Sequence, residues 1–331
     1  MIITVTLNTA VDKTLAVPNF RLGRRHRTVE QTTMPGGKGV NVARVLKTLG
    51  QPVIATGLAG GATGTGIVEQ LTQFSVVSDF VRIREESRTN TAVIDPTTGE
   101  QTEINERGPA VSEAEVEMFV DKLLYLAQGA SLCVFAGSLP RQVDTDVYAR
   151  LIPELRRLGV ETVVDTDGDP LRRAVRAEPD VISPNVLEAE ELVGHEFNDE
   201  EDQAIAVREM VDLGAREAIM TAGDGCYALM APEHRPQGPS PAPGHAEPVL
   251  YRVRGPALEP ASTVGSGDAF LAGFVAARYL GRPVPESLAY GVAVGAESTQ
   301  HLGAGIVDPG RVERILDEVS VERPVLRAEV G

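Results

Sequence analysis

The sequence contains no tryptophan and only two cysteines, and just 4% of its 331 residues are aromatic. With so few rings, the core has to be built from Val, Leu, Ile and Ala, and apolar residues make up 42% of the chain. Two cysteines cannot form the disulfide framework of a small secreted protein. We therefore expect a buried free thiol at Cys133 and a reducing compartment, the cytoplasm.

Long apolar runs and an excess of basic residues are also missing. No run approaches the roughly 20 apolar residues of a transmembrane helix, and the N-terminus lacks the pattern of a signal peptide. The 31 basic residues face 47 acidic ones, which gives a net charge of −16. So acidic a chain repels nucleic acid and anionic membranes, so we expect neither as a partner. A local basic pocket can still bind an anionic substrate.

Short apolar runs alternate with helical patterns through most of the chain. The predicted strands are residues 2–7, 52–58, 132–135, 161–165 and 218–221, and the predicted helices are 41–49, 113–126, 144–158 and 202–213. We expect Ser112 to cap the second helix and Pro153 to interrupt the third. The alternation predicts an α/β fold, a mostly parallel sheet with helices on both faces.

Two polar regions, at about residues 11–35 and 88–107, do not suit a buried parallel sheet. Residues 88–94 and 101–105 predict a hairpin across the turn at 96–99. We expect a small accessory β-sheet here that acts as a lid on a single domain spanning residues 1–331. The proline-rich stretch at about 232–248 predicts a flexible surface insertion.

The most informative segment runs from Ser262 to Phe274. Gly265 and Gly267 precede an apolar helical run, so their backbone N–H groups can converge where the helix dipole is positive. Such a turn forms an anion hole for a phosphoryl group. Asp268 opens the helix, where a carboxylate could take a proton from an attacking hydroxyl. The simpler interpretation is a glycine turn with an aspartate favoured by the dipole.

This run resembles the Thr-x-Gly-x-Gly-Asp signature of the ribokinase-like sugar kinases, also called the phosphofructokinase B family. The resemblance implies a three-layer α/β/α fold, Asp268 as the catalytic base, and an anion hole made by Gly265, Ser266, Gly267 and the Asp268 amide. A second segment, residues 35–44, is similar to the family's Gly-Gly-Lys-Gly-x-Asn element. Both segments occur in the family's order.

Further segments are similar to the phosphosugar-kinase branch of the family: residues 6–12, 58–64 and 137–140, and Arg88 before Thr89. The substrate-binding residues that the resemblance implies are Asp12, Gly36, Gly37, Lys38, Asn41, Arg88, Ser138 and Arg27. Arg88 and Lys38 would hold a phosphate already on the sugar, as would Arg25 and Arg27, for which a solvated basic turn is an equal alternative.

Residues 184–188 resemble the family's Asn-x-x-Glu element, and residues 221–225 resemble a nucleotide loop whose glycines here lie one residue closer together. The implied nucleotide-binding residues are Asn185, Glu188, Thr221, Gly223, Gly225 and Thr263, with Glu188 organising Mg²⁺ through water. Asn185 and Glu188 also suit a helix capping box. Ser183 stands where the branch usually has lysine. The alternating Asp165, Asp167 and Asp169 follow a predicted strand and suit either a cation-binding loop or a solvated turn, of which we favour the solvated turn.

The resemblance predicts ATP-dependent phosphorylation of a ketohexose phosphate, with ATP and Mg²⁺ as cofactors. The segment Thr102–Asn105 favours fructose 1-phosphate as the acceptor. Alternatives are a tagatose-6-phosphate kinase, a 6-phosphofructokinase, a kinase of an unphosphorylated sugar, and a weakly catalytic sugar- or nucleotide-binding regulator. A dinucleotide-dependent oxidoreductase lacks its Gly-x-Gly-x-x-Gly fingerprint. Because lid sheets in this family often pair between subunits, the resemblance also implies a homodimer through the lid.

Overall fold

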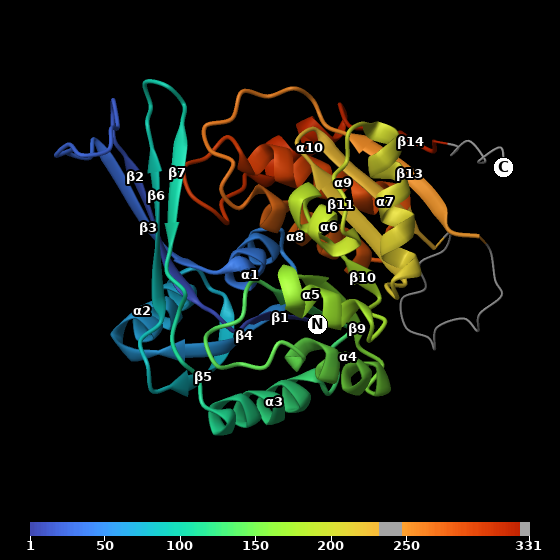
Figure 1. The fold of residues 1–331 in the computed structure, drawn as a ribbon, viewed down its shortest axis with the longest axis horizontal. Coiled ribbons are helices and arrows are strands. Elements are labelled where there is room, and N and C mark those ends of the chain that lie inside the picture. Colours follow the sequence, from blue (N-terminus) through green and yellow to red (C-terminus); the bar gives the residue numbers. More distant parts are fainter. Residues whose placement is uncertain (232–246, 325–331) are drawn as a thin grey trace.

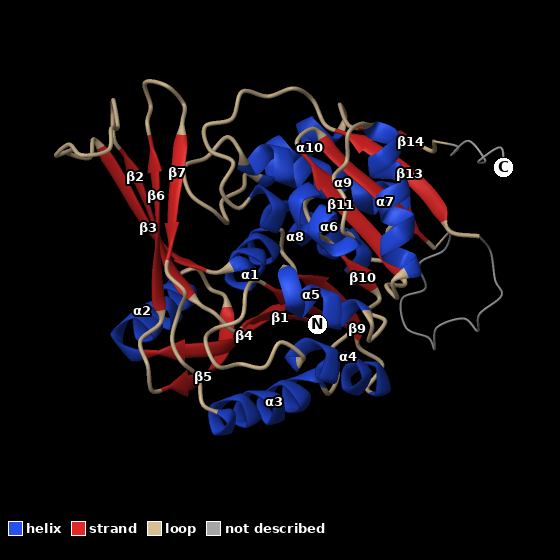
Figure 2. Ribbon diagram, in the orientation of Figure 1, coloured by secondary structure: helices blue, strands red, loops and turns tan. Residues whose placement is uncertain are grey.

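The computed structural model describes residues 1–231 and 247–324, so most of the predicted proline-rich insertion lies outside the described residues. Within these two ranges the strands form a ten-stranded main sheet and a four-stranded accessory sheet. The accessory sheet stands beside the main sheet and its helices, on the left in Figure 1, and Figure 2 separates strands from helices.

The main sheet is parallel through its centre and antiparallel at one edge. Its order is β14-β13-β12-β11-β10-β9-β8-β1-β4-β5. The parallel strands are β1 (Ile2–Thr6), β4 (Val53–Gly60), β5 (Val77–Ile83), β8 (Leu132–Ala136), β9 (Glu161–Asp165), β10 (Val181–Ile182) and β11 (Glu217–Ala222). The antiparallel strands are β12 (Gly225–Met230), β13 (Val249–Arg254) and β14 (Ser320–Glu322), none of which was predicted.

Helices cover both faces of the main sheet, which confirms the predicted three-layer α/β/α fold. One layer holds α1 (Lys38–Thr48), α2 (Gly61–Gln73), α8 (Ser266–Tyr279), α9 (Val284–Ser298) and α10 (Pro309–Leu316). The other holds α3 (Glu113–Ala127), α4 (Val147–Arg157), α5 (Gly168–Val175), α6 (Val186–Val193) and α7 (Glu200–Asp212). Strand β1 is buried on both sides: Ile2 packs in the first layer, and Ile3 and Val5 pack in the second.

The predicted cap of α3 is confirmed, because Ser112 and Glu115 form a reciprocal capping box. The predicted interruption at Pro153 is wrong, since α4 continues through it to Arg157. Cys133 and Cys226 are both free and buried, as expected for Cys133. Among the described residues, no helix combines the length and apolar character that a membrane crossing requires.

The accessory sheet has the order β3-β2-β6-β7, formed by β2 (Ala10–Ala16), β3 (Glu30–Gly36), β6 (Arg88–Ile94) and β7 (Gln101–Asn105). The predicted hairpin is confirmed, because β6 and β7 pair antiparallel with Ile94 opposite Gln101. Strand β2 pairs with β3 on one side and β6 on the other, in a register that sets Asp12 opposite both Met34 and Asn90. Segments that are far apart in the sequence thus form one polar sheet.

Candidate active site

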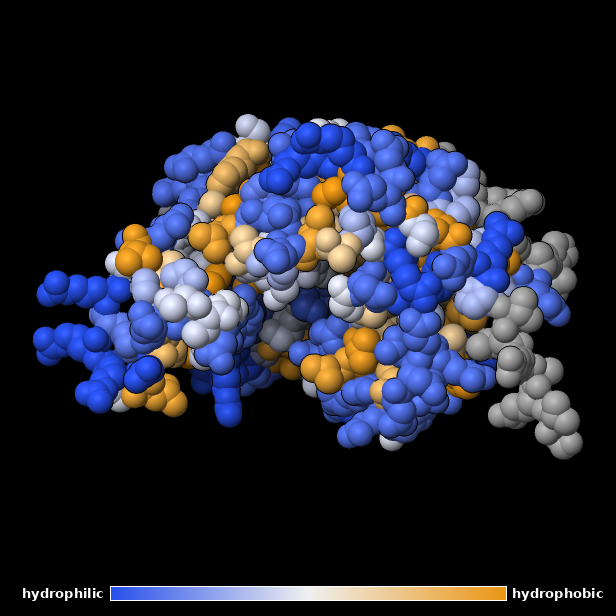
Figure 3. All heavy atoms as spheres, turned by 90° about the horizontal axis from the view of Figure 1, so that it is seen from above, coloured by the Kyte–Doolittle hydropathy of each residue, from blue (hydrophilic) through white to orange (hydrophobic). Residues whose placement is uncertain are grey.

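One cleft of ≈930 Å³ contains almost all of the predicted site residues. It lies where β1, β8, β9, β10 and β11 end, the edge at which parallel sheets bind ligands, and the accessory sheet forms its other wall. The predicted residues that line it are Asp12, Gly37, Lys38, Asn41, Arg88, Ser138, Asn185, Glu188, Thr221, Gly223, Gly225, Thr263, Gly265, Ser266, Gly267 and Asp268. Hydrophilic residues prevail on the hollowed face in Figure 3.

The two predicted signature segments meet inside this cleft. Asn41 of α1 donates its Nδ2 hydrogen to Asp268 Oδ2 at 2.9 Å, although the two residues are 227 positions apart in the chain. Asp268 is only 6% exposed. Burial, followed by the negative charge of Asp165, raises the pKa of Asp268 to about 7, against the smaller opposing effects of Lys38 and the Asn41 hydrogen bond. This carboxylate therefore changes its charge near neutral pH.

The predicted anion hole is the start of α8. Gly265 is the N-cap residue, and its φ of 76° lies in the left-handed region that glycine adopts without strain. The Ser266 and Ala269 amides donate to the carbonyls of Thr263 and Gly265. The amides of Gly267 and Asp268 belong to the first turn of the helix and have no partner within it. A Cβ at Gly267 would meet nothing within 4 Å, so an anion has room to approach.

A partly buried charge cluster lies at the end of the cleft that is predicted to bind the nucleotide. Lys38 Nζ donates to Asp165 Oδ1 at 2.8 Å and to Glu188 Oε1 at 3.1 Å. Burial lowers the pKa of Lys38, but the negative charges of Asp165, Glu188 and Asp268 together outweigh it and raise the pKa. The ammonium group thus balances carboxylates here, and its predicted contact with a sugar phosphate stays a prediction.

The interpretation of Asp165 as part of a solvated turn is wrong. Its side chain is 6% exposed, because it closes buried strand β9 and turns into the cleft beside Lys38. Asp167 and Asp169, further along the turn, are exposed. The signal that could have identified Asp165 was its place at the carboxyl end of a strand predicted to be buried.

Glu188 combines a structural and a site contact. Its Oε2 accepts the Asn185 amide at 2.9 Å, and Asn185 Oδ1 accepts the Glu188 amide at 3.0 Å, so the predicted capping box is confirmed. Its other oxygen faces Lys38. Among the described residues, no group of three or more His, Cys, Asp or Glu is arranged as a metal site. The pair Asp165 and Glu188 nevertheless fits Mg²⁺, which one or two carboxylates hold together with phosphate oxygens and waters.

The end of the cleft that is predicted to bind the sugar is built around Asp12. Its Oδ1 accepts a hydrogen bond from Asn90 Nδ2 at 2.9 Å, and a Cβ at Gly36 would lie 1.9 Å from its Oδ2. Gly36 is therefore not a lining residue but is needed for the carboxylate to fit. Burial raises the pKa of Asp12, against the opposing Asn90 bond and Arg88 charge. Asn90 lines the cleft and was not predicted; its position two residues after Arg88 on a strand was the available signal.

Arg88 and Ser138 are held by Asn8, a second residue that was not predicted as part of the site. Arg88 donates from Nε to the Asn8 carbonyl at 3.2 Å and from Nη1 to the Glu106 carbonyl at 3.0 Å. Asn8 Nδ2 donates to Ser138 Oγ at 3.2 Å. Arg27, by contrast, lies in the exposed loop between β2 and β3 and does not line the cleft of its own chain.

The shortened loop at residues 221–225 lines the cleft and distinguishes its two glycines. A Cβ at Gly225 would lie 1.9 Å from the Val253 carbonyl, so strand pairing requires that glycine. A Cβ at Gly223 would meet nothing within 4 Å, so Gly223 is the glycine whose backbone a ligand could approach closely. Arg252, 4% exposed, fixes the loop through two bonds to the Asp224 carboxylate, at 2.7 and 2.6 Å.

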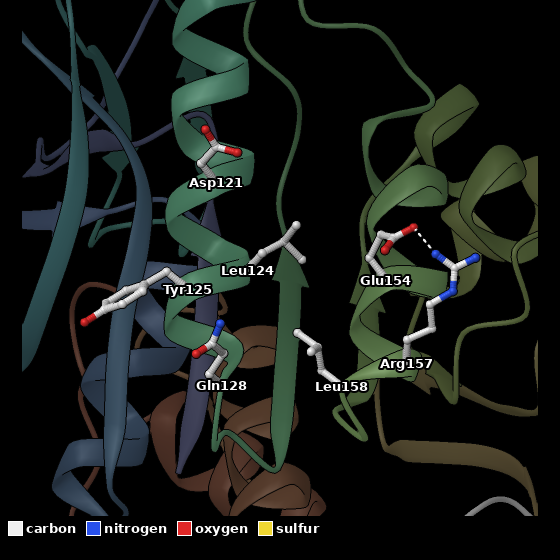
Figure 4. Close-up of a pocket in the computed structure, with 7 residues that line it drawn as sticks. All are labelled: Asp121, Leu124, Tyr125, Gln128, Glu154, Arg157 and Leu158. Atoms are coloured by element: carbon white, nitrogen blue, oxygen red, sulfur yellow. Dashed lines mark hydrogen bonds and ion pairs between the residues drawn. The ribbon is translucent and has the colours of Figure 1, made fainter.

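A second, smaller hollow lies between α3 and α4 (Figure 4). Leu124 and Leu158 face each other across it, and the pair formed by Glu154 and Arg157 stands at one side. Gln128 and Leu158 precede β8 and β9, so this hollow lies at the amino ends of the strands, away from Asp268. It brings together none of the predicted site residues.

Known proteins are similar to this chain over nearly its whole length. The profile described as "pfkB family carbohydrate kinase" matches residues 5–310. A 1-phosphofructokinase of Borreliella burgdorferi is 32% identical over 323 residues, which cover 97% of this chain and 98% of that protein. A tagatose-6-phosphate kinase of Staphylococcus epidermidis is 30% identical, with coverage of 97% and 99%. The phosphofructokinase-2 of Escherichia coli in complex with substrates and products has a TM-score of 0.84, 27% identity and coverage of 96% and 98%.

Proposed function

The chain belongs to the pfkB family of carbohydrate kinases, and we propose that it transfers the γ-phosphoryl group of ATP to a hydroxyl of a ketohexose phosphate, with fructose 1-phosphate as the preferred acceptor. The observation that carries this proposal is the bond between Asn41 and Asp268, which brings the sugar-side segment and the anion-hole segment to one point. A hydroxyl placed there has a base and an anion hole beside it.

In the proposed reaction, Asp268 accepts the proton of the attacking hydroxyl. The free amides at the start of α8 stabilise the charge on the phosphoryl group as it moves. Asp165 and Glu188 would hold Mg²⁺, which neutralises charge on the nucleotide phosphates when bound. Gly223, Gly225, Thr221 and Thr263 would contact the nucleotide, and Lys38 balances the carboxylates that surround the phosphates.

The proposed acceptor carries a phosphate held by Arg88, while Asp12, Asn41 and Ser138 orient its hydroxyls. Two polar residues of the segment that favoured fructose 1-phosphate, Glu103 and Asn105, line the cleft from β7. They are supplied by the accessory sheet, which we propose closes over the sugar and excludes water that would compete as an acceptor. The names of the relatives, a 1-phosphofructokinase and a tagatose-6-phosphate kinase, support the same substrate class.

A steady-state panel tests the acceptor directly. Fructose 1-phosphate, fructose 6-phosphate, tagatose 6-phosphate and the free sugars are each assayed with ATP and Mg²⁺. We expect the highest kcat/KM for fructose 1-phosphate. A higher kcat/KM for another phosphosugar would make that sugar the acceptor instead. Tight ligand binding without turnover would favour the weakly catalytic sugar- or nucleotide-binding regulator.

We also propose that two copies pair through the accessory sheet. Leu22 and Val29 of the loop between β2 and β3 and Ile104 of β7 are 90%, 70% and 62% exposed, and pairing would remove these apolar side chains from water. Arg27 does not line the cleft of its own chain, so its predicted contact with a sugar phosphate requires the cleft of a second copy.

Replacing Ile104 with Glu should therefore convert a dimer to monomers and raise KM for the sugar phosphate, because a charge would be buried at the interface. Analytical ultracentrifugation measures the assembly. Tyr125→Glu is the matched control, since Tyr125 is 73% exposed on α3 in the hollow of Figure 4 and should leave the assembly unchanged. A wild-type chain that sediments as a monomer would contradict the proposal.

The pKa of about 7 at Asp268 predicts a pH dependence of activity. The base must be ionised, so kcat/KM for the sugar should rise about tenfold per pH unit below pH 7 and level off above it. The sugar phosphate itself ionises near pH 6. The contribution of the sugar phosphate to the pH profile is measured separately with 6-deoxyfructose 1-phosphate, which lacks the acceptor hydroxyl. The pH dependence of its Ki reports binding alone. Identical profiles for 1/Ki and kcat/KM would show that Asp268 is not the titrating group.

A further inference from the structure

Arg44 is a buried arginine of α1 to which the proposed function assigns no role. It is 4% exposed and follows Lys38 and Asn41 at three-residue intervals, which makes the three side chains neighbours on the helix surface. Lys38 reaches the nucleotide end and Asn41 reaches Asp268. Arg44 bonds the backbone carbonyls of two other segments, at Pro35 and Ala304.

The Arg44 guanidinium joins two segments that are far apart in the chain. Its Nη1 donates to the Ala304 carbonyl at 2.9 Å and to the Pro35 carbonyl at 3.4 Å, and its Nη2 contacts Met34 Sδ at 3.6 Å. Met34 and Pro35 lead into the Gly36–Gly37 turn beside Asp12. Ala304 belongs to the loop between α9 and α10. One side chain thus ties the sugar turn to this loop.

The loop around Ala304 packs between Arg44 and the predicted anion hole. A Cβ at Gly305 would lie 2.8 Å from Arg44 Nη1, and a Cβ at Gly265 would lie 2.4 Å from Ala304 Cβ. Gly305 and Gly265 also have φ angles of 71° and 76°, so neither can be replaced without strain. Arg44 Nη1 thus lies against residues 304–305, and Ala304 of the same pair lies against the turn that opens α8.

We propose that Arg44 is a positioning residue that fixes the anion hole relative to the sugar turn, and so aligns the attacking hydroxyl with the phosphoryl group. This inference rests on the proposed kinase function. A misplacement of about 1 Å between reacting groups can cost 10²-fold in rate, whereas binding of each substrate alone is less sensitive to it. Loss of the Arg44 contacts should thus lower kcat and leave both KM values nearly unchanged.

A different role for Arg44 would be to balance the charge of Asp12, which its own charge stabilises. That role predicts a change in KM for the sugar. Arg44→Lys separates the two, because lysine keeps the charge but loses the planar guanidinium that places Nη1 on the Ala304 and Pro35 carbonyls and Nη2 on Met34 Sδ. Ala304→Gly tests the same alignment without touching Arg44, by removing the methyl group that packs on Gly265.

The experiment measures kcat, both KM values and the melting temperature with ATP and the phosphosugar that the wild type phosphorylates fastest. For Arg44→Lys we expect kcat to fall about tenfold or more and each KM to stay within about threefold; Ala304→Gly should lower kcat in the same way. Arg278→Lys is the matched control, since Arg278 is equally buried but pairs with Glu161 and Glu217 at the amino ends of β9 and β11. It should lower the melting temperature without changing kcat.

An unchanged kcat in Arg44→Lys, or a raised KM for the sugar with kcat unchanged, would overturn the inference. If Arg44→Lys does not fold, an unchanged kcat in Ala304→Gly overturns it instead. A wild-type chain that phosphorylates no sugar of the panel would count against the kinase function itself, which separates the two failures.

Discussion

Replacing Asp268 with Asn is expected to lower kcat by about 10³-fold or more, because general-base catalysis by a positioned side chain contributes about 10²–10⁴-fold. Asn keeps the shape of the side chain and an oxygen that can accept the Asn41 hydrogen bond. Both KM values should therefore change little. Steady-state kinetics with ATP and fructose 1-phosphate measure the effect.

The same substitution should not destabilise the fold above neutral pH. The pKa of Asp268 is about 7 in the folded chain and near 3.8 when unfolded, so the folded state binds the proton more tightly. Stability contributed by the protonated group is lost as the pH rises from about 4 to 7. At pH 8 the wild type contains a buried charge that Asp268→Asn removes, and the melting temperature of the variant should be at least as high.

Asp167→Asn is the matched control for this prediction, because Asp167 is an exposed acid that lines the same cleft. Its kcat should stay within about threefold of wild type, as for surface substitutions that break no contact. A kcat for Asp268→Asn above about a tenth of the wild-type value, well outside the range of a general base, would place the base elsewhere.

The sequence predicted those parts of the molecule that local backbone chemistry determines. The glycine turn at Gly265 and the hairpin of β6 and β7 follow from φ angles and strand alternation within a few residues. The antiparallel strands β12 and β13 were not predicted. Their pairing joins residues on either side of the proline-rich stretch, and nothing local specifies that two segments so separated lie side by side.

The site residues that sequence reasoning missed depend on partners far along the chain. Asp165 bonds Lys38, 127 positions earlier, and Asn90 bonds Asp12, 78 positions earlier. An aspartate after a strand has the same local pattern whether it is solvated or buried against a lysine. Arg27 shows the reverse case: a basic residue near the sugar motif in sequence lies outside the cleft of its own chain.

Replacing Arg88 with Met is expected to raise KM for the phosphosugar by about 100-fold with little change in kcat. Hydrogen bonds to charged groups contribute about 1.5–3 kcal/mol, and each 1.4 kcal/mol is a factor of ten in affinity. The phosphate lies away from the reacting hydroxyl, so its loss affects the bound sugar and the transition state alike. Activity with unphosphorylated fructose should be unaffected, and the ratio of kcat/KM for the two sugars measures the selectivity that Arg88 provides.

The fall in this ratio distinguishes phosphate binding from a structural role. Arg88 also donates to the carbonyls of Asn8 and Glu106, and Asn8 in turn bonds Ser138, so a merely structural loss would weaken both sugars equally. Arg84→Met is the matched control, since Arg84 is an exposed arginine four residues earlier. If Arg88→Met lowered kcat/KM equally for fructose and fructose 1-phosphate, Arg88 would stabilise the backbone at Asn8 and Glu106 rather than bind the phosphate. The acceptor would then not need a phosphate at that end of the cleft.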